Sequence, residues 1–334
     1  TQSRSSAASD VYKRQGYNAL YSNWGGCWNT AIGYEALTNN TTGLYNTAIG
    51  NTALKTNTTG YSNNAIGYYA LADNTTGQYN VALGHSALQS NTTGCHNIAA
   101  GLQSLRCNTT GCWNTAIGCG VLGSNTTGTH NAAIGRSALY CNIAGKCNVA
   151  VGYGTLYNNT SGSCNIGLGL NSLYCNTVGG CNIALGPNAL YTSLSGENNF
   201  AAGQCSLYSN YGGCYNTAVG INALKCNTTG CYNAAMGSYA LFTNTTGHNN
   251  NAIGQCALYS NTTGYQNNAM GVYALRYNTT GISNNAIGPY ALTKNTTGNY
   301  NNAIGESALA CNTTGGANTA MGTNALEQNT TGCY

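Results

Sequence analysis

Residues 29–45 read NTAIGYEALTNNTTGLY, and residues 46–62 read NTAIGNTALKTNTTGYS. The two stretches share the consensus N-x-A-I-G-x-x-A-L-x-x-N-T-T-G-x-x, which recurs every 17 residues from Gly16 to the end of the chain without a change of register. Strict recurrence at a short period is typical of repeat proteins in which each unit packs against its neighbours. We number the repeat positions from Asn29 as position 1 to Tyr45 as position 17.

The composition of the repeat excludes a helical unit, because Asn, Gly and Thr are poor helix formers and a helix–turn–helix needs more residues. The N-T-T-G of residues 40–43 is turn sequence, in which Gly supplies a positive φ and Asn tolerates it. We predict a flat coil with one strand over x-A-I-G and a second over roughly A-L-x-x, with corners at Gly33 and at residues 40–43. The predicted fold class is all-β, a parallel β-solenoid of about nineteen coils in one domain, residues 16–334.

Side chains alternate between the two faces of a strand. Ala31 and Gly33 then share a narrow face that lets two backbones approach closely, while Thr30 and Ile32 share the other. Position 4 is Ile, Leu, Val or Met in most repeats. A thin coil with an apolar outer face needs a second layer, so the pattern favours oligomerisation.

Identical residues in stacked coils form columns, and asparagine columns can pass side-chain hydrogen bonds from coil to coil. We expect such ladders at positions 1 and 12, where Asn recurs with one exception, Ser193 at position 12. The residues predicted to form the structural columns are, in the first complete repeat, Asn29, Ile32, Gly33, Leu37, Asn40 and Gly43.

Two stretches depart from the consensus. Residues 4–15, RSSAASDVYKRQ, fit no repeat, and we predict that residues 1–15 are a non-native, adaptor-like, disordered leader. The chain stops within a repeat, so we expect it to be a fragment. Residues 140–213 are the least regular repeats, which we interpret as drift within one domain.

The charge pattern argues against several functions. The chain has 46 Gly but only 10 Lys plus Arg and 6 Asp plus Glu, and its basic residues form no patch that would bind nucleic acid. It has no apolar run long enough to insert in a membrane. The acids are too sparse to act as an acid–base pair, and the four histidines lack metal-ligand spacing. We therefore predict no enzyme activity, cofactor or metal.

Cysteine is frequent, with 17 residues that cluster at positions 11, 16 and 17. Two disulfide geometries are open in an exported protein. One joins adjacent coils, as between Cys95 and Cys112, Cys147 and Cys164, or Cys214 and Cys231. The other bridges one N-T-T-G-type corner, and its candidates are the pairs Cys107/Cys112, Cys141/Cys147, Cys175/Cys181 and Cys226/Cys231.

N-T-T is also a formal acceptor for N-glycosylation. A turn combined with an Asn ladder explains the same residues without glycans, and we favour that interpretation. The candidate acceptors include Asn40, Asn57, Asn74, Asn91, Asn108 and Asn125.

At N-x-A-I-G-x-x-A the sequence resembles the head repeats of trimeric autotransporter adhesins, whose motif reads N-S-V-A-I-G-x-x-S. It is also similar to shaft repeats of phage-type tail-fibre proteins. The resemblance covers residues 16–334, although the adhesin repeat is shorter and lacks the N-T-T-G corner. It implies a left-handed β-roll, a homotrimer with Ile-type positions at the shared core, and attachment to a host surface.

We therefore expect a structural and adhesive fibre segment, extracellular on a cell surface or virion, that acts as a rigid spacer and contacts a host protein or glycan. The alternatives are an ice-binding solenoid and an N-glycosylated extracellular repeat protein. Ice binding is disfavoured because adjacent Thr41 and Thr42 point to opposite faces of a strand. A polysaccharide-cleaving enzyme lacks its carboxylates.

Overall fold

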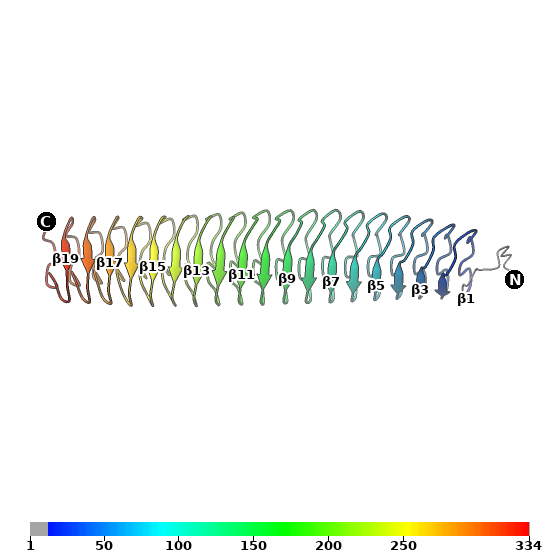
Figure 1. The fold of residues 1–334 in the computed structure, drawn as a ribbon, viewed down its shortest axis with the longest axis horizontal. Helices are drawn as coiled ribbons and strands as arrows, with labels where there is room; N and C mark the ends of the chain where they lie inside the picture. Colours follow the sequence, from blue (N-terminus) through cyan, green and yellow to red (C-terminus); the bar gives the residue numbers. More distant parts are fainter. Residues whose placement is uncertain (1–12, 334) are drawn as a thin grey trace. The chain divides into compact units, whose positions relative to one another are not determined.

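The structure, a computed structural model, describes residues 13–333. The chain divides into two compact units, Thr1–Ser163 and Cys164–Tyr334, and each unit is a stack of coils with one strand per coil (Figure 1). The boundary between the units falls inside the irregular stretch 140–213. The single continuous domain over 16–334 stays a prediction.

Every strand is three residues long. The first unit contains β1 (Lys13–Gln15), β2 (Thr30–Ile32), β3 (Thr47–Ile49), β4 (Asn64–Ile66), β5 (Val81–Leu83), β6 (Ile98–Ala100), β7 (Thr115–Ile117), β8 (Ala132–Ile134) and β9 (Val149–Val151). The second unit contains β10 (Ile166–Leu168), β11 (Ile183–Leu185), β12 (Phe200–Ala202), β13 (Thr217–Val219), β14 (Ala234–Met236), β15 (Asn251–Ile253), β16 (Asn268–Met270), β17 (Asn285–Ile287), β18 (Asn302–Ile304) and β19 (Thr319–Met321).

Successive strands within each unit pair in parallel with an offset of one repeat. In the first unit Ala31 of β2 aligns with Ala48 of β3, and in the second Ala235 of β14 aligns with Ala252 of β15. Because the repeat length sets this offset, identical residues stack in columns. The predicted all-β parallel solenoid with a 17-residue repeat is confirmed.

The predicted leader is too long. Lys13–Gln15 form β1 and pair in parallel with β2, in which Arg14 aligns with Ala31. Three residues outside the consensus can join the sheet because parallel pairing uses the backbone, which any sequence other than proline provides. The rest of the predicted leader, residues 1–12, lies outside the described part of the chain.

The predicted second strand over A-L-x-x is wrong. Its residues form turns, because Glu35 and Leu37 at positions 7 and 9 have φ values of 52° and 51°, in the left-handed region that interrupts extended backbone. This side of the coil is nevertheless bonded to its neighbours. The Glu35 N–H donates to Tyr17 O (2.8 Å) and the Leu37 N–H donates to Ala53 O (3.0 Å).

The core is narrow and repeats in every coil. Ala31, Ala36 and Leu37 are fully buried, so each coil inserts two small side chains and one large one between the strand and the turn opposite. A bulky residue in the left-handed region carries strain of about 1–3 kcal/mol. Burial of a leucine side chain contributes about 1.5–3 kcal/mol, which offsets that strain.

The two glycine corners differ from each other. Gly33 has a φ of +136°, as expected of a corner glycine. Gly43 of the N-T-T-G corner lies outside the left-handed region, so its predicted positive φ is wrong. Glycine is required there for space, because a Cβ on Gly43 would collide with Gly60 O in the next coil and with Asn40 Oδ1.

Candidate functional site

The asparagines at position 12 form a column that we call the corner ladder. Asn57 is fully buried, and its Nδ2 donates to Asn40 Oδ1 of the preceding coil (2.8 Å) and to Gly60 O of its own corner (2.9 Å). Asn74 and Asn91 repeat both bonds. Each side-chain amide therefore uses both of its donor hydrogens inside the protein, and the predicted ladder at this position is confirmed.

The asparagines at position 1 form a second column, the strand ladder, just before each strand. Asn63 is fully buried, and Asn46 Oδ1 accepts from both its backbone N–H (3.0 Å) and its Nδ2 (3.2 Å). Asn63 Nδ2 also donates to Gly77 O (2.9 Å). The side chain therefore joins its own coil to the preceding one.

The two ladders converge on the carbonyl group at position 15. Gly77 O accepts from Asn74 Nδ2 of the corner ladder (3.0 Å) and from Asn63 Nδ2 of the strand ladder (2.9 Å). A carbonyl oxygen has two lone pairs, so both are used at this point. We did not predict this shared acceptor from the sequence. The pattern that could have indicated it is the recurrence of Asn at positions 1 and 12 together with Gly at position 15 in the same repeat.

The corner ladder of the second unit is interrupted at Ser193. The Ser193 hydroxyl oxygen is buried and has no hydrogen-bond partner. The strand ladder continues past this coil, because Asn182 Nδ2 donates to Gly196 O (2.7 Å) and Asn199 Nδ2 donates to Asn182 Oδ1 (3.1 Å). The substitution therefore removes one ladder locally and leaves the other.

The predicted structural columns lie in the interior with one exception. Asn29, Leu37 and Asn40 are fully buried, and Gly33 and Gly43 lie at the two corners. Ile32 at position 4 points outward with 37% of its surface exposed. Its column continues on the strand side of each unit as an apolar stripe that we call the outer strand face, and its exposed members include Ile32, Ile66, Leu83, Ile117, Ile134, Leu168, Val219, Met236 and Met270.

The candidate glycosylation residues are members of the corner ladder. Asn40, Asn57, Asn74, Asn91, Asn108 and Asn125 are all fully buried, and each Nδ2 donates two hydrogen bonds. A glycan on Nδ2 would replace a donated hydrogen and would need space inside the corner. The folded coil therefore favours the ladder interpretation over glycosylation.

Two of the predicted coil-to-coil cysteine pairs are brought together. The Sγ atoms of Cys95 and Cys112 lie 3.0 Å apart, and the Cys95 backbone N–H donates to Cys112 Sγ (3.1 Å). The Cys214 N–H donates in the same way to Cys231 Sγ (3.2 Å). Burial, together with the hydrogen bond to Cys112, raises the pKa of the Cys95 thiol to about 11.

The third predicted coil-to-coil pair, Cys147 and Cys164, is exposed and stays a prediction. The remaining predicted pairs bridge a single corner and also stay a prediction. Their flanking residues Cys107, Cys141, Cys175 and Cys226 at position 11 are half-buried, and Cys147 and Cys181 at position 17 are exposed. Burial raises the pKa of the thiols of Cys141, Cys175 and Cys226 above its usual range.

Aromatic side chains also stack in columns. In the first unit the His96 ring lies 4.8 Å from that of Tyr79 and 3.9 Å from that of Trp113, measured between centroids. In the second unit the ring of Tyr191 stacks on those of Tyr174 and Tyr208 at 5.3 Å and 5.0 Å. Stacked rings cover one another's faces and present their edges outward.

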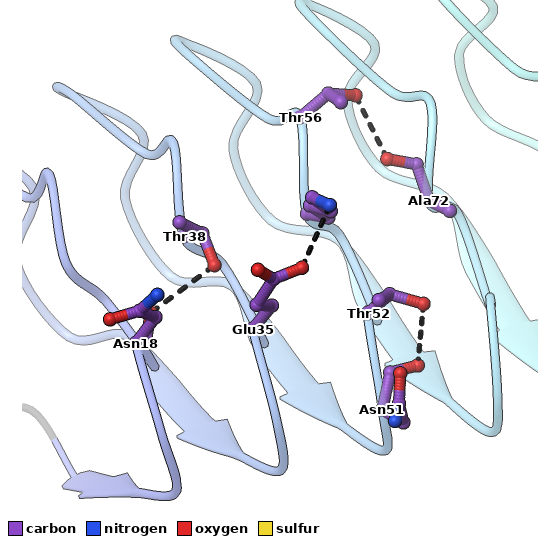
Figure 2. Close-up of polar contacts among 8 residues, drawn as sticks. Asn18, Glu35, Thr38, Asn51, Thr52, Thr56 and Ala72 are labelled. Atoms are coloured by element: carbon purple, nitrogen blue, oxygen red, sulfur yellow. Dashed lines mark hydrogen bonds and ion pairs between the residues drawn. The ribbon is translucent and has the colours of Figure 1, made fainter.

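Side chains of the turn opposite the strand tie neighbouring coils together (Figure 2). Thr38 Oγ1 donates to Asn18 O (3.2 Å), Thr56 Oγ1 donates to Ala72 O (2.8 Å), and Lys55 Nζ lies 2.7 Å from Glu35 Oε2. The hydrogen bond with Glu35 raises the pKa of Lys55. An exposed ion pair of this kind adds little stability, so the neutral bonds are the more important contacts.

Within residues 13–333, no three His, Cys, Asp or Glu side chains come together as a metal site. No helix in that range is long and apolar enough to cross a bilayer. Comparison with known proteins adds no assignment, because neither a protein-family model nor a curated protein matches this chain. The features that remain for a function are the two asparagine ladders, the outer strand face and the stacked cysteines.

Proposed function

We propose that this chain is a structural and adhesive segment of an extracellular fibre, either a cell-surface adhesin or a phage-type tail fibre. The observation that carries the proposal is a combination of two features. The buried asparagine side chains make their hydrogen bonds inside the protein, and the outer strand face exposes apolar side chains. Backbone pairing and the strand ladder hold the repeated coils in register and the corner ladder stabilises them, which suits a rigid spacer, and such a spacer needs no catalytic group.

The outer strand face requires a covering layer. Ile66, Leu83 and Ile117 are 41–43% exposed, and their strands belong to the same sheet. Monomeric proteins rarely leave a contiguous apolar stripe of this kind uncovered, because covering it removes apolar surface from water. We propose that two further copies of the chain cover the stripe in a homotrimer, with the position 4 side chains at the shared core.

A light-scattering mass measurement on the purified chain tests this assembly. We expect three times the chain mass of 34.4 kDa. A variant with Ile66→Thr, Leu83→Thr and Ile117→Thr should shift the mass toward the monomer, since each substitution introduces a β-branched residue that suits a strand and makes the stripe polar. A monomeric mass for the unsubstituted chain would contradict the trimer.

A control variant separates this effect from a general loss of apolar surface. Leu102 and Ile143 are 47% and 48% exposed but lie outside the strands, at positions 6 and 13. The double variant Leu102→Thr with Ile143→Thr should keep the trimeric mass. Dissociation of this control to the same extent would show that the outer strand face is not the interface.

The adhesive part of the proposal concerns the surface left exposed in such an assembly. Tyr215, Tyr232 and Tyr300 at position 17 are more than half exposed, and their hydroxyl groups can bind polar groups of a host protein or glycan. Binding of the intact chain to an array of immobilised glycans is the first test. A protein receptor is expected if no glycan is bound while the chain still binds protease-sensitive sites on cells.

Ice binding receives less support. The Thr41 hydroxyl donates to Thr58 O (3.0 Å), and Thr58 and Thr75 continue this series, so the position 13 hydroxyls are used inside the protein. Only the position 14 column, which begins with Thr42, is left exposed. We expect no thermal hysteresis in a solution of the purified chain, and a measurable thermal hysteresis would support ice binding.

A further inference from the structure

Two cysteines of neighbouring coils meet where the chain approaches β6 and β7, since Cys95 lies shortly before β6 and Cys112 shortly before β7. Cys95 and Cys112 both occupy position 16, one repeat apart, and their Sγ atoms are 3.0 Å from each other. Neighbouring parallel strands lie about 4.8 Å apart, a spacing within the Cα separation that disulfides accept. The two thiols can therefore be joined without a rearrangement of the coils.

The surroundings hold the pair in this geometry. The Cys95 N–H donates to Cys112 Sγ (3.1 Å), and Cys95 O accepts from the Trp113 N–H (3.0 Å). The residues that follow the two cysteines, His96 and Trp113, stack their rings at 3.9 Å with an interplanar angle of 3°. Both coils are thus fixed to each other immediately beside the sulfur atoms.

We propose that Cys95 and Cys112 form a reversible disulfide that joins these two coils, with a low-molecular-weight disulfide such as oxidised glutathione as the oxidant. Both cysteines are half-buried, and the exchange is written with Cys112 as the first nucleophile. The Cys112 thiolate forms a mixed disulfide and expels one glutathione thiolate. The Cys95 thiolate then attacks Cys112 Sγ and expels the second, so two protein thiols are oxidised and one glutathione disulfide is reduced to two thiols.

Part of this arrangement recurs in the second unit. The Cys214 N–H donates to Cys231 Sγ at 3.2 Å, and the following residues Tyr215 and Tyr232 stack at 5.0 Å with an interplanar angle of 1°. We assign a second crosslink to this pair on the backbone-to-sulfur hydrogen bond and the ring stack. Each bridge closes a loop of one coil, so it would prevent the two coils that it joins from separating.

Tryptic mapping of the intact chain after oxidation by glutathione disulfide under native conditions tests the proposal. Trypsin cleaves after Arg106, so Cys95 is the one cysteine of peptide 56–106, while Cys107, Cys112 and Cys119 lie in peptide 107–136. We expect the two peptides to be recovered covalently joined, with a mass two hydrogen atoms below their sum, and to separate on reduction. Recovery of peptide 56–106 as a free or glutathione-capped thiol would overturn the proposal.

Matched variants identify the partner sulfur. Cys112→Ser should abolish the joined peptides, whereas Cys107→Ser, at the other flank of the same corner, should leave their yield unchanged. If Cys107 and Cys112 instead bridge their own corner, the bond lies within peptide 107–136 and no joined species forms, which contradicts the coil-to-coil assignment. A circular dichroism spectrum equal to that of the unsubstituted chain confirms that each variant is folded.

Discussion

Two corners of the second unit, residues 244–247 and residues 193–196, differ in their residue at position 12 of the corner ladder, which is Asn244 in one and Ser193 in the other. At the regular corner, Asn244 Nδ2 donates to Asn227 Oδ1 (2.8 Å) and to Gly247 O (3.0 Å), and Asn244 Oδ1 accepts from Asn261 (2.9 Å). At the irregular corner, the buried Ser193 hydroxyl oxygen has no partner. The strands β11 and β12 of the irregular region still pair in register.

The comparison separates two roles. Backbone pairing and the strand ladder suffice to keep the register, since both continue through the Ser193 coil. The corner ladder adds stability to coils that are already aligned. We therefore expect changes at the regular corner to cost more than the same changes at the irregular one, and each effect to stay within the neighbouring coils.

The largest effect is expected from Gly247→Ala. A Cβ on Gly247 would collide with Asn244 Oδ1 and with Gly264 O, so the corner must open and the ladder must break. Overpacking and lost bonds should together lower the local stability by about 3 kcal/mol or more. Hydrogen exchange measured by mass spectrometry on peptides of these coils reports the change.

Gly196→Ala is the matched substitution at the irregular corner. There the nearest atoms to a Cβ are Gly213 O at 2.6 Å and Asn210 Nδ2 at 2.8 Å, and the collision with an asparagine oxygen of its own corner is missing. The loss of protection should be smaller than for Gly247→Ala. Equal losses would show that the corner ladder contributes nothing to the difference.

The next largest effect is expected from Asn244→Ala. It removes three hydrogen bonds and leaves buried polar groups on Asn227 and Asn261 without this partner. Since an unsatisfied buried group costs about 1–3 kcal/mol, we expect a loss of roughly 2–3 kcal/mol. The urea concentration at the midpoint of unfolding and the exchange rates of the neighbouring coils should both report it.

Ser193→Asn should stabilise the chain. The new side chain restores the consensus residue, can accept from Asn210 Nδ2 and can donate to Gly196 O, as Asn244 does at its own corner. We expect a gain of about 1–2 kcal/mol, measured as slower hydrogen exchange in residues 182–213. Ser193→Ala is the control and should change the stability little. If alanine stabilises the chain as much as asparagine does, the gain comes from removing the hydroxyl group and not from restoring the ladder.

The smallest effect is expected from Leu194→Thr. At the regular corner Thr245 Oγ1 donates to Thr262 O (3.0 Å). Leu194 at the same position is 42% exposed; its backbone N–H donates to Tyr211 O (3.2 Å), but its side chain cannot donate to that carbonyl. A threonine hydroxyl would add one bond to the same carbonyl, with a gain of about 0.5–1 kcal/mol. An unchanged unfolding midpoint would remove the threonine column from the list of stabilising features.

The repeat alone predicts the register, the asparagine ladders and the corner at Gly33, because columns follow from a constant period. It does not predict the conformation at position 9. Leu37 is a bulky residue in the left-handed region, which local preference disfavours and burial between neighbouring coils stabilises. The frequent Asn, Ser and Gly at position 7 were a usable signal that the A-L-x-x segment turns.

The candidate site was predicted less completely than the fold. Sequence spacing placed Cys112 both opposite Cys107 across a corner and above Cys95 in the stack, and only the side-chain positions bring Cys95 and Cys112 together. The shared carbonyl of Gly77 was not predicted either, because it depends on where two corners meet in space.

Hydrogen exchange of the asparagine side-chain amides tests the ladders most directly. Selective ¹⁵N labelling of asparagine makes the Nδ2 protons visible by NMR, and the buried ladder residues can be compared with exposed ones such as Asn249. We expect the Nδ2 protons of Asn227, Asn244 and Asn261 to exchange as slowly as the backbone amides of β13–β15, and the Asn249 protons to exchange immediately. Immediate exchange of all asparagine side chains would contradict the ladders.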